Sequence, residues 1–116
     1  MNKLILIGGE LATGKTTLAR ALSKKLNIPF FYKDILKEAL ADTIGFKNRE
    51  ENKQLSVAVF DIFLNISKGF IESNNDLILE SNFKQNEINE LEKLFNNANY
   101  HIISIVLSGD DEILYE

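Results

Sequence analysis

The sequence lacks cysteine and tryptophan and has only one proline, one histidine and two arginines. Without cysteine the chain can form no disulfide, thiolate metal site or cysteine nucleophile. The lone His101 argues against a zinc centre, and its place just before a predicted strand favours a surface or packing role. No unbroken apolar stretch approaches the roughly 18 to 20 residues of a membrane span, and the N-terminus lacks the features of a signal peptide. We therefore expect a cytoplasmic protein that does not contact a membrane.

Charge of one sign is not in large excess either, with 13 Lys and Arg against 17 Asp and Glu and a net charge of −4. The longest basic cluster is the pair Lys24 and Lys25, so charge does not favour a nucleic acid as partner. Apolar residues make up 45% and charged residues 26%, which is typical of a globular domain. A chain of 116 residues has room for one core, so we expect a single domain over residues 1–116.

The apolar pattern predicts strands that alternate with helices. Short apolar runs predict strands over residues 3–7, 30–32, 77–80 and 102–107. Helical spacing predicts helices over residues 16–26, 34–44, 49–73 and around 88–98, and Gly45 is expected to end the second of them. In the third helix, Phe60, Phe63 and Phe70 are spaced so as to pack into the core. From Glu112 onward we expect the first turn of another helix. This alternation predicts an α/β fold with a parallel sheet.

One motif, at the end of the first predicted strand, carries chemistry. The residues Gly9, Glu10, Leu11, Ala12, Thr13, Gly14, Lys15 and Thr16 fit the phosphate-loop pattern G-x-x-x-x-G-K-[ST], and Thr17 continues into the predicted helix. Glycines let backbone N–H groups surround phosphate oxygens, and the helix N-terminus adds positive charge. The Lys15 ammonium suits the β- and γ-phosphates, and the Thr16 hydroxyl suits Mg²⁺. The alternative, a glycine-rich turn with an exposed lysine, does not explain Lys-Thr at this spacing.

Two carboxylates follow the second and third predicted strands. The carboxyl ends of parallel strands face the crevice where ligands bind, so Asp34 and Glu80 would flank the phosphate loop. Asp34 has an alternative role as the N-cap of the next helix, and the two roles can coexist. Glu80 directly follows a buried apolar run, where a carboxylate needs a cationic or metal partner. Its alternative is a solvated strand end.

With the phosphate loop, the segment from Tyr32 to Leu40 and the segment from Leu79 to Phe83, the sequence resembles the small P-loop kinases often described as AAA family ATPases. That group is similar to polynucleotide 5′-kinase, chloramphenicol phosphotransferase, zeta toxin and the gluconate and shikimate kinases. The resemblance covers nearly the whole chain. It implies a P-loop NTPase fold, a three-layer α/β/α sandwich with strand order 2-3-1-4. Such kinases usually continue with a fifth strand and an arginine-bearing lid, which we expect to be missing here.

The resemblance also implies roles for individual residues. Asp34 would take the proton from the acceptor hydroxyl, and Glu80 would lie near Mg²⁺ or the acceptor. Lys37 stands where polynucleotide kinases have an arginine that contacts the acceptor, and a lysine cannot repeat a bidentate contact. Arg49 falls in the region that covers the acceptor in relatives. Ala12 replaces a glycine that is common in the kinase loop.

The sequence thus predicts an ATP- and Mg²⁺-dependent phosphotransferase acting on a hydroxyl of a small molecule or a nucleic-acid end, with Lys15, Asp34 and Glu80 as catalytic residues. The alternative is a nucleotide-binding module without its own transfer chemistry, because the lid arginines are not in this sequence. Such a chain would expose a sheet edge and could form a homodimer through it. ATP hydrolysis that drives motion is the weakest alternative, because no second domain or finger arginine is visible.

Overall fold

The computed structural model describes residues 1–9, 14–108 and 113–115. Its strands are β1 (Lys3–Gly9), β2 (Phe30–Tyr32), β3 (Leu77–Glu80), β4 (His101–Leu107) and β5 (Ile113–Tyr115). Its helices are α1 (Lys15–Leu26), α2 (Lys33–Ile44), α3 (Arg49–Glu72) and α4 (Gln85–Asn97). The four predicted strands and the four predicted internal helices are therefore confirmed, with small differences at their ends.

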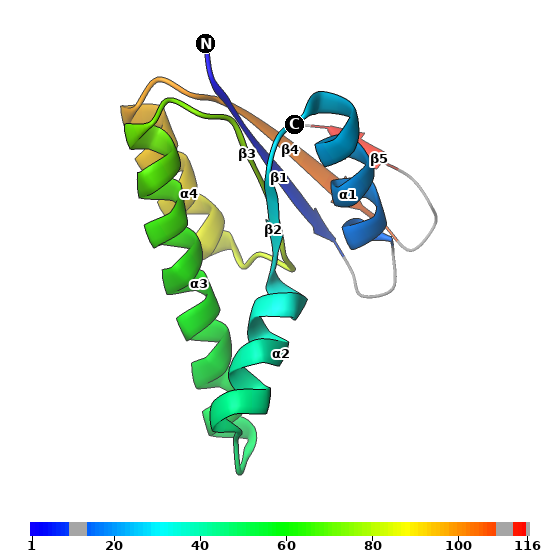
Figure 1. Ribbon diagram of the computed structural model, residues 1–116, viewed down its shortest axis with the longest axis vertical. Coiled ribbons are helices and arrows are strands. Elements are labelled where there is room, and N and C mark those ends of the chain that lie inside the picture. The colour runs from blue at the N-terminus through cyan, green and yellow to red at the C-terminus, as the bar shows by residue number, and fades with distance from the viewer. Residues whose placement is uncertain (10–13, 109–112, 116) are drawn as a thin grey trace.

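The strands form one sheet in the order β2-β3-β1-β4-β5. β1 lies in the middle and pairs in parallel with β3 on one side and with β4 on the other. β2 pairs in parallel with the outer side of β3. The predicted α/β fold and the strand order 2-3-1-4 are confirmed, and the carboxyl ends of β1, β2 and β3 lie at the same end of the sheet (Figure 1).

The end of the chain differs from the prediction. Residues 113–115 form strand β5, which pairs antiparallel with β4, so the helical turn expected from Glu112 onward is wrong over these residues. The sheet has five strands, and the expected absence of a fifth strand is also wrong. The physical reason is that β4 offers an unpaired row of backbone groups, which a short extended segment satisfies better than an isolated turn of helix. The sheet edge that we expected to be exposed is therefore paired along Ile105–Leu107 of β4.

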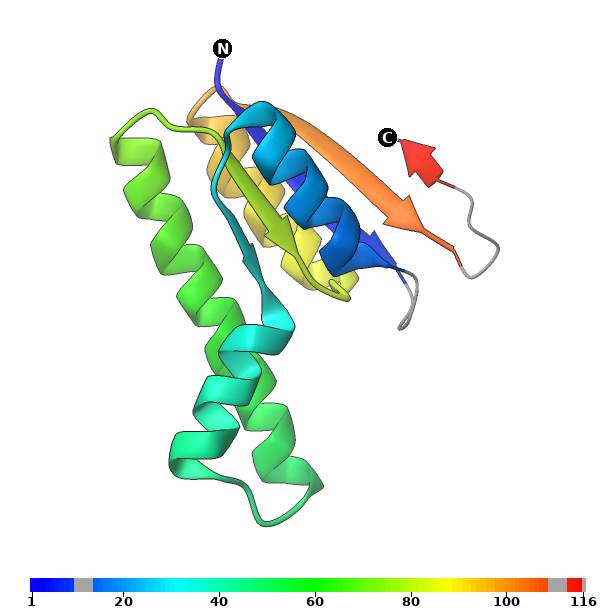
Figure 2. The same cartoon turned by 45° about the vertical axis from the view of Figure 1, so that its right-hand side comes forward.

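Helices cover both faces of the sheet and make three layers (Figures 1 and 2). Along β1 the side chains alternate, as in any strand. Leu4 and Leu6 belong to a core cluster with residues of α3 and α4, including the predicted core residue Phe63. Ile5 and Ile7 belong to a second cluster with Ala19 of α1. Because both faces of β1 are buried, its sequence is a continuous apolar run, as the sequence analysis assumed.

Helices α2 and α3 form a hairpin that projects past the carboxyl ends of the strands (Figure 1). Gly45 ends α2 with a φ of 69°, and its N–H donates to the carbonyl of Ala41. The side chain of Asn48 caps α3 by accepting a hydrogen bond of 2.9 Å from the N–H of Glu51. These caps fix both ends of the connection between the two helices.

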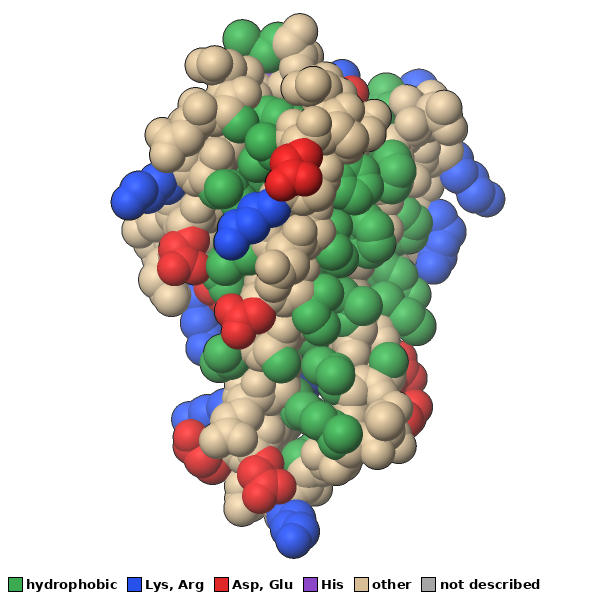
Figure 3. All heavy atoms as spheres, turned by 60° about the vertical axis from the view of Figure 1, so that its left-hand side comes forward, with side chains coloured by type: hydrophobic (Ala, Val, Ile, Leu, Met, Phe, Trp, Pro, Cys, Tyr) green, Lys and Arg blue, Asp and Glu red, His purple; other side chains and the backbone are tan. Residues whose placement is uncertain are grey.

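Helix α3 is the most apolar helix of the described residues and is long enough, by length and composition alone, to cross a membrane. The sequence analysis found no unbroken apolar stretch long enough for a membrane span, but α3 passes the test of helix length and mean hydropathy, because its polar residues interrupt the apolar run without making the helix polar on average. Core helices of soluble proteins pass the same test, and α3 turns Leu55, Val59 and Phe63 toward the interior. Its outer side includes the exposed Val57, and Figure 3 shows hydrophobic side chains gathered in a strip on this face of the molecule.

Candidate active site

Two glycines mark the ends of the phosphate loop. Gly9 closes β1 with a φ of 131°, and a Cβ at this position would lie 2.2 Å from the carbonyl oxygen of Leu107 in β4. Gly14 precedes α1 in the left-handed conformation, with a φ of 83°. Gly9 is required because its backbone approaches β4 closely, and Gly14 is required because its backbone is left-handed. The predicted loop residues Glu10, Leu11, Ala12 and Thr13 lie outside the described residues.

Lys15 begins α1 and is buried, with 9% of its surface exposed. Its Nζ donates a hydrogen bond of 3.0 Å to the carbonyl oxygen of Gly9, which holds the ammonium over the end of β1. The first turn of α1 contains no acidic residue, so the positive end of the helix dipole and the lysine charge add together. The alternative of a turn with an exposed lysine is therefore wrong, and the site attracts anions.

Glu80 ends β3 opposite this helix start. Its side chain is 3% exposed, and its Oε2 accepts a hydrogen bond of 2.9 Å from the hydroxyl of Thr16. Glu80 lies in register between Ile7 of β1 and Tyr32 of β2, which places it at the centre of the carboxyl edge of the sheet. The alternative of a solvated strand end is wrong, and a buried carboxylate stands beside the predicted Mg²⁺ ligand.

Burial raises the pKa of the Glu80 carboxyl above its usual range, and the nearby charge of Asp34 adds to this effect. The hydrogen bond from Thr16 and the charge of Lys15 act in the opposite direction without cancelling it. A carboxylate that is incompletely compensated in this way is stabilised by a cation. Thr16 and Glu80 together supply the hard oxygen donors that Mg²⁺ prefers.

Within residues 1–9, 14–108 and 113–115, no group of three or more His, Cys, Asp or Glu side chains could enclose a metal ion. Mg²⁺ in nucleotide sites commonly keeps few protein ligands and takes the rest of its shell from phosphate oxygens and water. The pair of Thr16 and Glu80 fits that kind of site and does not fit a metal site built from protein groups alone.

Asp34 lies in the first turn of α2, beside the carboxyl end of β3. The N-cap of α2 is Tyr32, without a side-chain cap bond, so the interpretation of Asp34 as the N-cap is wrong. Asp34 is exposed, and its charge acts on both Glu80 and Lys33. Lys37, half-buried one turn further along α2, also acts on Lys33. The structure therefore brings Asp34 and Lys37 to the strand ends that carry Glu80.

The two arginines do not join this group. Arg49 begins α3 at the far end of the α2–α3 hairpin, about 15 Å along α2 from Asp34 at 1.5 Å per helical residue. Arg20 lies on α1 with its guanidinium 5.8 Å from the ring centroid of Phe30, a cation–π distance. Thr17 is exposed in the first turn of α1, and His101 is exposed at the start of β4.

Sequence analysis did not single out two residues that the structure makes neighbours beside these strand ends, Lys33 and Asn82. Lys33 follows β2 directly, Asn82 follows β3 by two residues, and the Nζ of Lys33 donates a hydrogen bond of 2.9 Å to Oδ1 of Asn82. Their positions in the sequence could have indicated them, because both residues lie just after the strands that precede Asp34 and end in Glu80. What the sequence did not contain was the pairing of β2 with β3, which makes these two residues neighbours.

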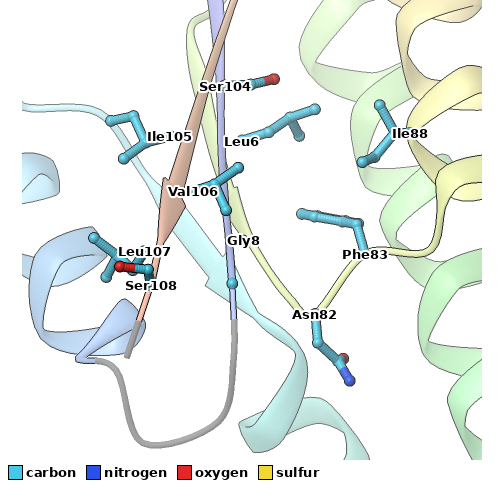
Figure 4. Close-up of a pocket in the computed structure, with 11 residues that line it drawn as sticks. Leu6, Gly8, Asn82, Phe83, Ile88, Ser104, Ile105, Val106, Leu107 and Ser108 are labelled. Carbon is cyan, nitrogen blue, oxygen red and sulfur yellow. The ribbon is translucent and has the colours of Figure 1, made fainter. Parts of the chain in front are cut away.

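A cavity of about 370 Å³ opens beside the phosphate loop, on the face of the sheet opposite α1. Its floor includes Leu6, Gly8 and Val106 from β1 and β4, and Phe83 and Ile88 lie on the opposite side (Figure 4). The lining is mostly apolar, so the cavity suits a nonpolar group better than a phosphate.

The chain is similar to known proteins over most of its length. A family model described as an AAA domain matches residues 5–116. A candidate kinase from Chloroflexus aurantiacus superimposes with a TM-score of 0.84 and is 31% identical, over 91% of this chain and 59% of its own. No curated protein matches the sequence.

More distant structures show the same fold. The APS kinase of Mycobacterium tuberculosis is 14% identical, with a TM-score of 0.61 over 97% of this chain and 80% of its own. A gluconokinase from Sinorhizobium meliloti is 14% identical, with a TM-score of 0.57 over 90% of this chain and 56% of its own. The predicted resemblance to small P-loop kinases is confirmed. The present chain spans 59% of the length of the Chloroflexus protein.

Proposed function

This chain belongs to the AAA domain family, and we propose that it is an ATP- and Mg²⁺-dependent phosphotransferase that moves the γ-phosphate of ATP to a hydroxyl of a small molecule or of a nucleic-acid end. The observation that carries the proposal is the hydrogen bond of 2.9 Å between Thr16 and the buried Glu80. It joins the end of the phosphate loop to the strand end beside Asp34. This contact supports a nucleotide site next to Asp34 as the proposed base for an acceptor hydroxyl.

The proposed division of labour follows from these positions. Lys15 and the backbone N–H groups at the start of α1 hold the phosphates. Thr16 and Glu80 would hold Mg²⁺, which neutralises charge on the phosphate oxygens when it is bound. Asp34 accepts the proton of the acceptor hydroxyl while the hydroxyl oxygen forms a bond to the γ-phosphorus. The bond from the γ-phosphorus to its bridging oxygen breaks, and ADP leaves.

A second function, nucleotide binding without transfer, is favoured by the position of the arginines. Arg49 begins α3 at the far end of the α2–α3 hairpin, and Arg20, about one turn beyond Thr16 on α1, has its guanidinium over the ring of Phe30. An arginine on the transferring phosphoryl group accounts for about 10³ to 10⁵ in rate where one is used. In this second case another protein or a second copy of the chain would supply that group.

One experiment separates the two functions. ADP release from MgATP is measured with and without a broad panel of hydroxyl compounds, for the wild type and for Asp34→Asn. The proposed transferase releases ADP faster with at least one acceptor and loses that increase in the variant. If MgATP binds but no hydroxyl compound increases ADP release, the chain is a nucleotide-binding module.

A further inference from the structure

We propose that Asn82 donates a hydrogen bond to the phosphoryl acceptor and that Lys33 is the positioning residue that fixes the orientation of the Asn82 amide. This inference rests on the proposed function and deepens it by naming the chemistry of one part of the acceptor. The acceptor group that faces Asn82 is an oxygen with available lone pairs, as in a hydroxyl, carbonyl or carboxylate, and not an N–H group.

The two residues are neighbours because of the sheet. Tyr32, the last residue of β2, pairs with Glu80, the last residue of β3, so the chain segments that leave these strands run side by side. Lys33 is the next residue on one segment and Asn82 lies two residues further on the other. Their side chains meet in the hydrogen bond of 2.9 Å from Nζ to Oδ1, across 49 residues of sequence.

Lys33 is held in place by its surroundings. Its side chain is half-buried and lines a small cavity together with Phe60 and Phe63 of α3 and Glu87 of α4. Burial lowers the pKa of the Lys33 ammonium, and the charge of Lys37 lowers it further, while Glu87 and Asp34 favour the charged form. A lysine packed along its stem and bonded at its tip has fewer rotamers than a surface lysine.

The lysine determines which way the Asn82 amide turns. An ammonium group has three donors and no acceptor, so the amide atom that faces it is the oxygen. Ser81 Oγ lies 3.5 Å from the same Oδ1. The two N–H donors of Asn82 therefore face away from Lys33, and no side-chain or backbone oxygen of the described residues accepts a hydrogen bond from them.

The Asn82 donors lie at the carboxyl end of the sheet. Asn82 is exposed, follows Glu80 by two residues and is among the residues that line the apolar cavity, and Figure 4 shows its amide pointing away from the apolar side chains of that cavity. Asp34 at the start of α2 lies at the same end. Asp34 directly follows Lys33, whose side chain bonds Asn82, so in this proposal the acceptor that reaches Asp34 also contacts the Asn82 amide. The amide selects an oxygen there because it offers only N–H groups.

The test follows the side-chain amide signals of Asn82 by nitrogen–proton NMR, and it requires no catalysis. Sodium acetate is the probe for a lone-pair oxygen and methylammonium chloride is the probe for an N–H group, at matched ionic strength. Asn82→Asp assigns the signals by removing them, and the exposed Asn97 at the end of α4 is the internal reference. We expect acetate to shift the Asn82 signals in a saturable way and methylammonium to leave them in place.

Two variants test the role of Lys33. Lys33→Met keeps the apolar stem but removes the donor, so the amide can rotate, and the acetate response should weaken severalfold. Lys33→Arg keeps a donor and should retain most of the response. A response to methylammonium instead of acetate, no response to either probe, or a full acetate response in Lys33→Met would overturn the inference. The proposed function fails separately, in the ADP-release experiment.

Discussion

Thr16 and Glu80 are 64 residues apart in the sequence, and the hydroxyl of one donates a hydrogen bond of 2.9 Å to the carboxylate of the other. The contact connects the start of α1 to the end of β3, although β1 is the strand that leads into α1. It exists because β3 lies beside β1 in the sheet, with Glu80 in register with Ile7. This pair is the part of the site where nucleotide, cation and protein would meet.

The first prediction concerns the stability of Glu80→Gln. Because the pKa of Glu80 is raised in the folded state, its stabilising contribution is complete below the pKa of the unfolded chain and is lost as the pH rises through the folded pKa. Glutamine still accepts the Thr16 hydrogen bond and carries no charge. We therefore expect the variant to gain stability relative to the wild type between acidic and neutral pH, measured by thermal unfolding.

The control for this prediction is Glu90→Gln, at an exposed position on α4. Its stability relative to the wild type should change little over the same pH range. A Glu80→Gln protein that becomes less stable relative to the wild type as the pH rises would contradict a raised pKa for Glu80 in the folded state. The same variant should bind MgATP more weakly than the wild type, because one proposed Mg²⁺ ligand loses its charge.

The second prediction is that Lys15→Ala weakens MgATP binding by about 10- to 100-fold, the usual effect of losing a hydrogen bond to a charged group. The reason is that the Lys15 ammonium lies over the end of β1, held by the carbonyl of Gly9. Calorimetric titration measures the effect. Lys25→Ala, near the exposed end of α1, removes the same charge far from the loop and should leave the affinity close to that of the wild type.

The third prediction compares two glycines. Gly9→Ala would place a Cβ 2.2 Å from the Leu107 carbonyl oxygen at a φ of 131°, so the end of β1 must move away from β4. We expect a loss of more than about 1 kcal/mol in the free energy of unfolding, and weaker nucleotide binding. Urea unfolding gives the first quantity and calorimetry gives the second.

Gly69→Ala is the matched change within a helix. Among the described residues, no atom outside the adjoining helix backbone lies within 4 Å of a Cβ added at Gly69 in α3, so the variant should gain about 0.5–1 kcal/mol from helix propensity. Equal effects of the two substitutions would mean that close approach to β4 is not what requires glycine at Gly9.

The fourth prediction separates binding from transfer at Asp34. Asp34→Asn removes the proposed base but leaves Lys15 and Thr16 unchanged, so MgATP affinity should remain while acceptor-dependent ADP release falls by about 10²- to 10⁴-fold. Asp42→Asn, exposed two turns further along α2, should leave transfer unchanged. A parallel loss of MgATP binding in Asp34→Asn would show that Asp34 serves the nucleotide and not the acceptor.

Much of the fold was predictable because its signals are local. Apolar runs identified β1 and β3, helical spacing identified α3, and Gly45 marked the end of α2. The phosphate loop was also predictable, since its residues are consecutive. The last segment was not, because residues 113–115 form a strand only through pairing with β4. Their own sequence does not specify that partner.

The site divides in the same way. Lys15, Thr16 and Glu80 could be proposed from a motif and a strand end, and the structure brings them together. The sequence also suggested Arg49, which the α2–α3 hairpin carries away from the loop. The length of α2 separates Arg49 from the phosphate loop, and the comparison of motifs contained no information about that distance.

The sequence by itself determined the first four strands and the four helices, their order along the chain and the phosphate-loop motif, because backbone conformation and motif chemistry depend on residues close in the chain. Only the tertiary structure decided which strand ends became neighbours. The order β2-β3-β1-β4 places Glu80 beside Thr16 and Lys33 beside Asn82, across 64 and 49 residues. Such contacts depend on burying both faces of one shared sheet, and no local segment specifies that arrangement.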